Sequence, residues 1–223
     1  MAIAPAVLFD LDGTLVDSAG DLTAAVNALR EGFGWAPQPV DMVRPAISVG
    51  ALAILARGLP ELAEAERAKR LDDFLEAYRE RIGLHGGLFP GIAQALAAIE
   101  QAGAAWGVVT NKRESLARIV LERLDLASRC AVLIGGDTLA RCKPDPMPVR
   151  EACARIGVTP AQAVFVGDDA RDIAAGRAAG TRTLAVAWGF HAAGDEPAHW
   201  NADAVLQTPA DLLRDGMLAA RAA

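Results

Sequence analysis

Residues 6–14 read AVLFDLDGT, and this stretch sets the expectation for the whole chain. A short run of apolar residues leads into Asp10, followed by Leu11, Asp12 and Gly13. A run that is apolar throughout, rather than alternating with polar residues, is typical of a parallel strand covered on both faces. Glycine allows the sharp turn that must follow such a strand. We therefore predict a buried strand over residues 6–10 that places two carboxylates at its end.

The same pattern recurs along the chain. Further strands are predicted at 105–110, 131–134, 163–167 and 183–187, with a weaker one at 204–206. Helical patterns lie between them at 91–102, 113–124, 146–156 and 170–179. Strand followed by helix, repeated, predicts an α/β fold: a doubly wound parallel sheet with a Rossmann-like core.

One long segment interrupts this alternation. Residues 17–87 contain no strand pattern but three helical ones, at 18–32, 42–57 and 61–81. A crossover between parallel strands needs only one helix, so the surplus predicts an inserted helical cap. Gly86, Gly87 and Pro90 mark the return to the sheet. The predicted division is a core of residues 1–17 and 87–223 and a cap of residues 18–86.

Composition narrows the function classes. The chain has 223 residues, of which 52% are hydrophobic and 22% charged, and its net charge is −6. The negative charge argues against nucleic acid or an anionic membrane as partner. No run approaches the ~20 apolar residues of a membrane span, and the start of the chain lacks the basic pattern of a signal peptide. Cys130, Cys142 and Cys153 form no CxxC pair, so we expect reduced thiols and a cytoplasmic location.

Polar clusters follow the predicted strands. They are Asp10 to Thr14, Thr110 with Asn111, Lys143 before Pro144, and Gly167 to Asp169 with Asp172 a helical turn further on. Each cluster alone has an ordinary explanation as a turn, a helix cap or a solvated loop. Ligands of open parallel sheets bind beyond the carboxyl ends of the strands. The occurrence of all four clusters at such ends predicts one shared site.

The residue types suit phosphoryl transfer. Asp10 and Asp12 are two apart, so both carboxylates can lie on one side of an extended segment, as one nucleophile and one general acid/base. Gly13 can bring backbone N–H groups toward an anion. Asp168 adds an oxygen ligand for Mg²⁺, which typically takes one or two carboxylates. Without such an ion, a carboxylate nucleophile and a phosphate would repel each other.

The remaining clusters supply donors and positive charge. Thr110 and Asn111 offer neutral donors to phosphoryl oxygens, and Lys143 is a compact cation for the nucleophile and the transferring group. Together the clusters predict a small-molecule phosphate ester as substrate and Mg²⁺ as cofactor.

These four clusters resemble those of the haloacid dehalogenase superfamily, with the helical insert where that family has its cap. The resemblance implies an aspartyl-phosphate mechanism. It implies these roles: Asp10 as nucleophile, Asp12 as acid/base with its carbonyl on the metal, Thr110, Asn111 and Lys143 on the phosphate, Asp168 as a Mg²⁺ ligand, and Asp172 beside that set, orienting Lys143 or metal-bound water. Asp169 stands where relatives often carry Ser and is left out of the metal set.

Branches of the family differ at these positions. Dehalogenases and phosphonatases lack a carboxylate corresponding to Asp12, and sugar-phosphate mutases often have a His where this chain has Leu22, so a phosphatase is favoured. FDLDGTLVDS (9–18) resembles the phosphoglycolate phosphatase group. WGVVTNK (106–112), VGDDARDIAAGRAAGTRT (166–183) and GDEPAHWNADAV (194–205) are similar to bacterial N-acetylmuramic acid 6-phosphate phosphatases. We expect N-acetylmuramic acid 6-phosphate, a cell-wall recycling intermediate, as substrate, with 2-phosphoglycolate as the alternative.

Substrate choice is expected to lie in the cap. Arg44, Ser48, Val49 and Gly50 begin its second helical pattern, where a guanidinium and backbone N–H groups could meet a substrate carboxylate. The ordinary alternative is that the cap arginines are solvated. The chain is expected to be a monomer or a homodimer.

Two other function classes remain as alternatives. A catalytically silent binding module would be expected to lose Asp10, Asp12 or Asp168, and all three are present. A phospho-accepting receiver domain also uses Asp, Thr and Lys on a doubly wound sheet, but receivers lack a helical insert. Phosphate release from p-nitrophenyl phosphate that EDTA abolishes would separate the enzyme from both.

Overall fold

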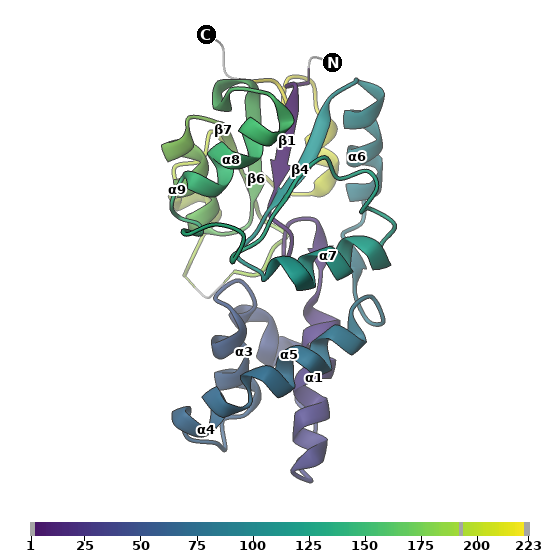
Figure 1. The fold of residues 1–223 in the computed structure, drawn as a ribbon, viewed down its shortest axis with the longest axis vertical. Coiled ribbons are helices and arrows are strands. Elements are labelled where there is room, and N and C mark those ends of the chain that lie inside the picture. Colours follow the sequence, from purple (N-terminus) through teal and green to yellow (C-terminus); the bar gives the residue numbers. More distant parts are fainter. Residues whose placement is uncertain (1–2, 192–193, 221–223) are drawn as a thin grey trace.

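The computed structural model describes residues 3–191 and 194–220, and within them lies one six-stranded parallel sheet in the order β5-β4-β1-β6-β7-β8 (Figure 1). The strands are β1 Ala6–Phe9, β4 Ala105–Val109, β5 Leu133–Ile134, β6 Ala163–Gly167, β7 Arg182–Val186 and β8 Ala204–Leu206. The chain moves outward from β1 in both directions, so the predicted doubly wound α/β sheet is confirmed.

Both faces of the sheet are covered by helices. The helices around it are α6 Ile92–Gln101, α7 Glu114–Arg123, α8 Met147–Ile156 and α9 Ala170–Ala179, with short 3-10 turns at Pro160–Gln162, Pro197–His199 and Pro209–Leu213. Successive residues of β1 serve opposite faces: Val7 and Phe9 join the cluster that includes α6, whereas Ala6 and Leu8 join the cluster that includes α8. Burial on both faces explains why the strands are apolar without alternation.

Predicted and observed elements of the core agree closely. The bounds of β6 and α9 are those predicted, and the other core helices and strands β1, β4, β7 and β8 differ by at most one residue at each end. The predicted strand at 131–134 is shorter than expected, although the N–H of Ala131 still donates to the carbonyl of Trp106 at 2.9 Å.

The inserted segment is helical, as predicted, but more broken than expected. It contains α1 Ala19–Gly32, α2 Val40–Val43, the 3-10 turn Arg44–Ala46, α3 Ala51–Gly58, α4 Glu64–Lys69 and α5 Leu71–Arg81. The single helix predicted over 42–57 is wrong: Pro45 lies in the 3-10 turn, and Gly50 has φ +121°, a value that ends one helix before the next begins. The helix predicted over 61–81 is likewise divided at Arg70. Figure 1 shows this cap standing beyond one end of the sheet.

A short antiparallel ribbon joins the cap to the sheet domain, and it was not predicted. Strands β2 Val16–Asp17 and β3 Gly87–Leu88 pair directly. The carboxylate of Asp21 accepts hydrogen bonds from the N–H groups of Gly83 at 2.8 Å and His85 at 2.7 Å, which holds the returning chain against α1. The predicted domain division stays a prediction, and its boundaries fall at this ribbon.

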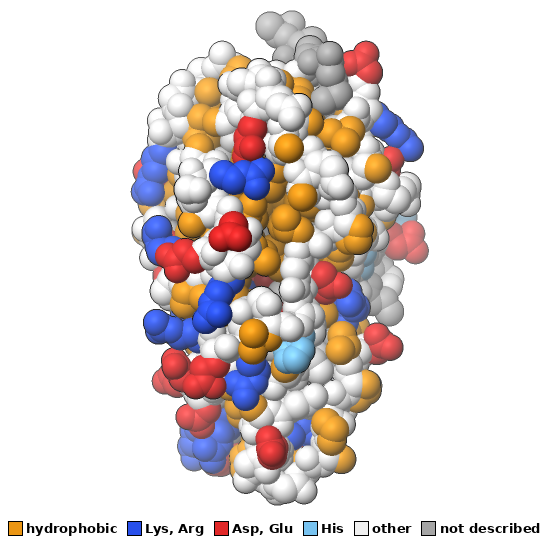
Figure 2. Space-filling view, turned by 90° about the vertical axis from the view of Figure 1, so that its right-hand side faces the viewer, with side chains coloured by type: hydrophobic (Ala, Val, Ile, Leu, Met, Phe, Trp, Pro, Cys, Tyr) orange, Lys and Arg blue, Asp and Glu red, His pale blue; other side chains and the backbone are white. Residues whose placement is uncertain are grey.

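The surface carries charges of both signs. On the face in Figure 2, acidic and basic side chains lie interspersed. In the described part of the chain, no helix has the length and apolar character needed to cross a bilayer.

Candidate active site

The strand register brings the predicted residues to one edge of the sheet. Phe9 at the end of β1 is paired with Val108 of β4 on one side and with Val166 of β6 on the other. All three strands are parallel, so the residues that follow them emerge together: Asp10 after β1, Thr110 after β4 and Asp168 after β6. The structure thus brings these residues together at one edge of the sheet, as expected, and their shared function stays a prediction.

Lys143 lies at the centre of this edge. Its side chain is only 3% exposed, and its Nζ donates to Asp10 Oδ1 and lies 2.7 Å from both that oxygen and Asp172 Oδ1. A third contact, at 2.8 Å, goes to the carbonyl of Val109. Burial alone would lower the pKa of Lys143, but Asp10 and Asp172 outweigh that effect and raise it. Burial raises the pKa of Asp172 to about 7, against the opposing effect of Lys143.

Asp168 is held on both oxygens. Its Oδ1 accepts from the hydroxyl of Thr14 at 3.0 Å, and its Oδ2 accepts from the hydroxyl of Ser48 at 3.1 Å and the N–H of Phe190 at 3.0 Å. Burial, followed by the charges of Asp10 and Asp172, raises the pKa of Asp168 well above its usual range.

Glycines make room for this carboxylate. A Cβ on Gly13 would lie 2.0 Å from Asp168 Oδ2, and one on Gly189 would lie 2.2 Å from Asp168 Cβ. Gly13 also has φ +87°, which favours glycine. Its own N–H donates to the carbonyl of Val16 at 2.9 Å, whereas the expectation that this turn brings backbone N–H groups toward a phosphate stays a prediction. Gly13 also provides clearance beside Asp168.

Three buried carboxylates could hold a metal ion. Oxygens of Asp10, Asp168 and Asp172 all lie within 4.8 Å of one another. Carboxylates gathered this closely repel each other, and the raised pKa values of Asp168 and Asp172 express that cost together with burial. A hard divalent cation with oxygen ligands fits this donor set. Asp172, expected only beside the ligand set, thus belongs to the cluster, whereas the carboxylate of Asp12 does not.

The side chains of Thr110 and Asn111, the two residues after β4, form hydrogen bonds with other groups of the protein. The side-chain amide of Asn111 accepts from the N–H of Lys143 at 3.0 Å and donates to the carbonyl of Lys143 at 3.0 Å. The hydroxyl of Thr110 accepts from the N–H of Lys112 at 3.2 Å. Asn111 therefore positions the loop that carries Lys143, a function that the sequence did not indicate.

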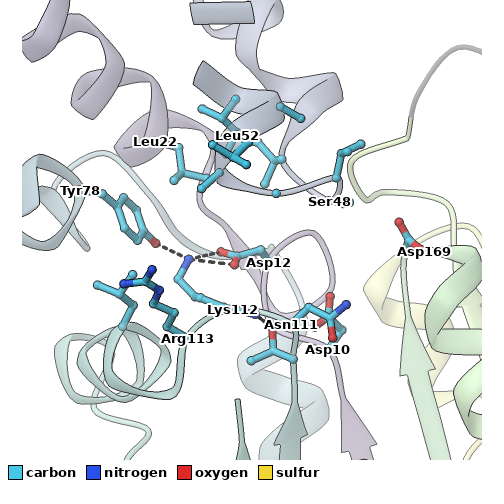
Figure 3. Close-up of a pocket in the computed structure, with 18 of the residues that line it drawn as sticks. Asp10, Asp12, Leu22, Ser48, Leu52, Tyr78, Asn111, Lys112, Arg113 and Asp169 are labelled. Carbon is cyan, nitrogen blue, oxygen red and sulfur yellow. Dashed lines mark hydrogen bonds and ion pairs between the residues drawn. The ribbon is translucent and has the colours of Figure 1, made fainter. Parts of the chain in front are cut away.

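Asp12 has an unpredicted partner in Lys112. The Nζ of Lys112 donates to both oxygens of Asp12, at 3.0 and 2.8 Å, and to the hydroxyl of Tyr78 at 2.8 Å (Figure 3). Burial alone would lower the pKa of Lys112, but Asp12 and Tyr78 raise it, and burial raises the pKa of Tyr78 to about 12. Tyr78 belongs to α5 of the cap, so this contact joins cap and core. The sequence signal that could have identified Lys112 is the stretch Thr110-Asn111-Lys112, which does not indicate the partners of this lysine.

A cavity of about 510 Å³ opens between the cap and the strand ends. Asp10 and Asp12 lie on its polar side, facing an apolar wall from α3 and α5 of the cap (Figure 3). Lys143 also lines the cavity. That wall and its surroundings include Leu22, Ile47, Val49, Leu52, Ile54, Leu71, Phe74, Leu75 and Tyr78.

Some of the predicted substrate-binding residues of the cap line the cavity, and one does not. Ser48 and Gly50 line the cavity, as does Val49. Arg44 is not part of the lining: its guanidinium lies 3.2 Å from Asp17 Oδ2 and 5.3 Å from the ring centre of Phe190. The expected role of Arg44 in meeting a substrate carboxylate finds no support in the cavity lining, and its charge is paired with Asp17 in this structure.

Asp169 and Arg171 form a further link to the cap. Asp169 is the N-cap of α9 and accepts from the N–H of Arg171 at 2.8 Å, so its place outside the metal cluster has a structural reason. Burial would raise the pKa of Asp169, but the hydrogen bonds from Arg171 lower it. The guanidinium of Arg171 also donates to the carbonyl of Ser48.

Comparison with known proteins agrees with the site. The family model for haloacid dehalogenase-like hydrolases matches residues 7–186. A phosphoglycolate phosphatase from Xylella fastidiosa is 48% identical over 91% of this chain and 89% of that protein. An N-acetylmuramic acid 6-phosphate phosphatase from Pseudomonas aeruginosa is 42% identical over 93% of this chain and 92% of that protein.

A solved structure gives the same result. The crystal structure of a predicted phosphoglycolate phosphatase from Haemophilus somnus superposes with a TM-score of 0.84 at 28% identity, covering 96% of this chain and 98% of that one. The resemblance drawn from the four clusters is thereby confirmed: the chain belongs to the haloacid dehalogenase-like hydrolase family.

Proposed function

We propose that this protein is a Mg²⁺-dependent phosphatase of a small phosphate ester, working through an aspartyl-phosphate on Asp10. The observation that carries the proposal is the buried group formed by Asp10, Lys143 and Asp172, which line one cavity, with Asp168 in the same carboxylate cluster. Family membership and relatives that are named phosphatases support it.

Asp10 serves as the nucleophile. Lys143 donates to its Oδ1, which fixes the carboxylate and leaves Oδ2 for attack on phosphorus. The bond between phosphorus and the ester oxygen breaks as the bond to Asp10 forms, and the charge of Lys143 stabilises the transferring group. A Mg²⁺ ion held by Asp10, Asp168 and the carbonyl of Asp12 would neutralise phosphoryl charge that otherwise repels the nucleophile.

Asp12 serves as the general acid/base. It gives a proton to the departing ester oxygen and then takes one from the water that hydrolyses the aspartyl-phosphate. Lys112 donates hydrogen bonds to both oxygens of Asp12 and so holds this carboxylate in one orientation. Thr110 and Asn111 are proposed to help hold the phosphate, Asn111 through the remaining amide proton.

The preferred substrate is N-acetylmuramic acid 6-phosphate, with 2-phosphoglycolate as the second candidate. A cavity of about 510 Å³ is in the range that suits a ligand of sugar size. The apolar cap wall suits the acetyl and lactyl methyl groups. The phosphoglycolate phosphatase relative at 48% identity favours the second candidate. Leu22 on the cavity wall has no titratable group, which disfavours a mutase.

The test is hydrolysis by purified protein. Release of phosphate from p-nitrophenyl phosphate should require Mg²⁺ and stop in excess EDTA. Asp10→Asn should abolish it, and Arg155→Gln, an exposed change on α8, serves as a control that should retain it. More than a tenth of wild-type activity in Asp10→Asn would refute the covalent mechanism.

The substrate is decided by kcat/KM for both compounds on one preparation. A tenfold preference for 2-phosphoglycolate, about 1.4 kcal/mol in transition-state binding, would overturn the substrate choice and leave the phosphatase proposal standing.

A further inference from the structure

Four cationic side chains of the described residues line the cavity: Lys112, Arg113, Lys143 and Arg171. Three of them lie 2.8 Å or less from a carboxylate: Lys112 from Asp12, Lys143 from Asp10, and Arg171 from Asp169. The guanidinium of Arg113 forms no ion pair or hydrogen bond with any other residue in the described part of the chain. It is therefore the cation of this group that a ligand can engage without displacing a protein carboxylate.

Arg113 lies away from the phosphoryl-transfer end. In Figure 3 it is drawn on the opposite side of Lys112 from Asp10, and it lines the cavity as Tyr78 does. Its backbone is fixed because it is the N-cap of α7. A second anionic group of the ligand would be repelled near the carboxylate cluster, whereas near Arg113 it would meet an unpaired positive charge.

We propose that Arg113 is the specificity residue that binds a second anionic group, a carboxylate, at the end of the substrate remote from the phosphate. This inference rests on the proposed phosphatase function. The planar guanidinium matches a carboxylate through two parallel hydrogen bonds. The protein has a net charge of −6, so attraction for a dianionic and carboxylated ligand must come from such local cations.

The separation of the two sites selects for substrate length. In 2-phosphoglycolate a single carbon separates the ester oxygen from the carboxylate, and Lys112 is drawn between Asp10 and Arg113 in Figure 3, so this substrate is expected to be too short to engage both residues. In N-acetylmuramic acid 6-phosphate the lactyl ether and the phosphate lie on different ring substituents, several bonds apart. The ligand class that fits is a phosphorylated sugar acid rather than a phosphorylated two-carbon acid.

A matched pair of substrates isolates this contact. N-acetylglucosamine 6-phosphate differs from N-acetylmuramic acid 6-phosphate only in lacking the lactyl ether and its carboxylate. The measured quantity is the ratio of their kcat/KM values, which cancels any general loss of activity in a variant. Because Arg113 is exposed, its contact with a carboxylate is partly screened by water. A change of about tenfold is expected, as for one charge-assisted contact.

Arg113→Gln should lower the ratio of kcat/KM for N-acetylmuramic acid 6-phosphate to that for N-acetylglucosamine 6-phosphate about tenfold. Arg113→Lys should lower this ratio less. Arg44→Gln is the control, because Arg44 lies outside the cavity lining, and its ratio should match the wild type. A ratio in Arg113→Gln within twofold of wild type, or a loss in Arg44→Gln instead, overturns the inference. Wild-type protein that hydrolyses p-nitrophenyl phosphate without discriminating between the sugars also overturns it but leaves phosphatase activity intact. Failure to hydrolyse any of the three compounds overturns the proposed function itself.

Discussion

Replacing Lys112 by methionine tests the link between the cap and Asp12. The ammonium makes three hydrogen bonds: two to Asp12, at 3.0 and 2.8 Å, and one to the hydroxyl of Tyr78 at 2.8 Å. The side chain of Lys112 is 9% exposed and that of Asp12 16% exposed, so little water can replace what is lost. Methionine keeps the apolar stem and removes only the charge and the donors.

The expected loss of stability is about 3 kcal/mol. Removing one partner of a buried ion pair typically costs about 3–5 kcal/mol, because the other charge stays buried without compensation. Because Asp12 is partly exposed, the stability loss expected for Lys112→Met lies at the lower end of this range. For a chain of this size about 1 kcal/mol corresponds to about 2–4 °C, so Tm should fall by roughly 6–12 °C.

The pH dependence of this loss has a definite sign. The pKa of Lys112 is higher in the folded protein than its ordinary value, so its stabilisation is complete below the unfolded pKa of about 10.4. The difference between wild type and Lys112→Met should therefore stay constant from pH 6 to 9. It should shrink only as the pH rises through the folded pKa.

The assay is urea unfolding of wild type, Lys112→Met, Asp12→Asn and the double variant in EDTA. The two single losses should not add, because both remove the same ion pair. Tyr78→Phe is the matched control, since it removes one hydrogen bond and no charge, and it should cost about 1 kcal/mol. A loss below about 1 kcal/mol in Lys112→Met, or strictly additive losses, would refute the coupling of these three residues.

Other changes have separate expected outcomes. Gly13→Ala should abolish phosphatase activity and weaken Mg²⁺-dependent stabilisation, because its Cβ would lie 2.0 Å from Asp168 Oδ2; a thermal shift with Mg²⁺ equal to wild type would contradict this. The metal-free protein should lose stability as the pH rises from about 4 through 7, since the pKa of Asp172 is raised to about 7 by burial and its charged form is the unfavourable one. Thermal unfolding in EDTA from pH 4 to 8 measures this, and Mg²⁺ should reduce the slope; a Tm that rises over this interval would oppose it. Arg30→Met should cost about 1–3 kcal/mol in urea, since the carbonyl of Gly58, 2.8 Å from the guanidinium, loses its donor inside the cap; unchanged unfolding would oppose this.

Much of the core was predictable because its signals are local. The apolar run before Asp10 and the one before Asp168 each identify a buried strand, and parallel pairing then brings the following residues to one edge. The bounds of α9 were correct because Asp169 is a strong N-cap and Gly180 ends the helix in the left-handed region. These features depend on residues close in sequence.

The cap was less predictable because its helices are divided by backbone geometry. Pro45 and Gly50 were visible in the sequence, but an apolar pattern continues across them and suggested one helix. The paired strands β2 and β3 are two residues long, too short for any periodicity to reveal.

Only the tertiary structure decided which charges pair. The sequence singled out Arg44 as a cation for the substrate and gave no sign of Arg113, yet Arg44 faces Asp17, whereas Arg113 lines the cavity and its guanidinium pairs with no other residue in the described part of the chain. Lys112 meets Asp12 across 100 residues of chain and Tyr78 across 34. The residue types and the strand ends were determined locally, by patterns that the sequence by itself contains. The partners of Asp12 and Arg44, and the position of Arg113 on the cavity wall, depend on how cap and core pack, because a charge pair over such separations forms only where packing brings the two groups within a few ångströms.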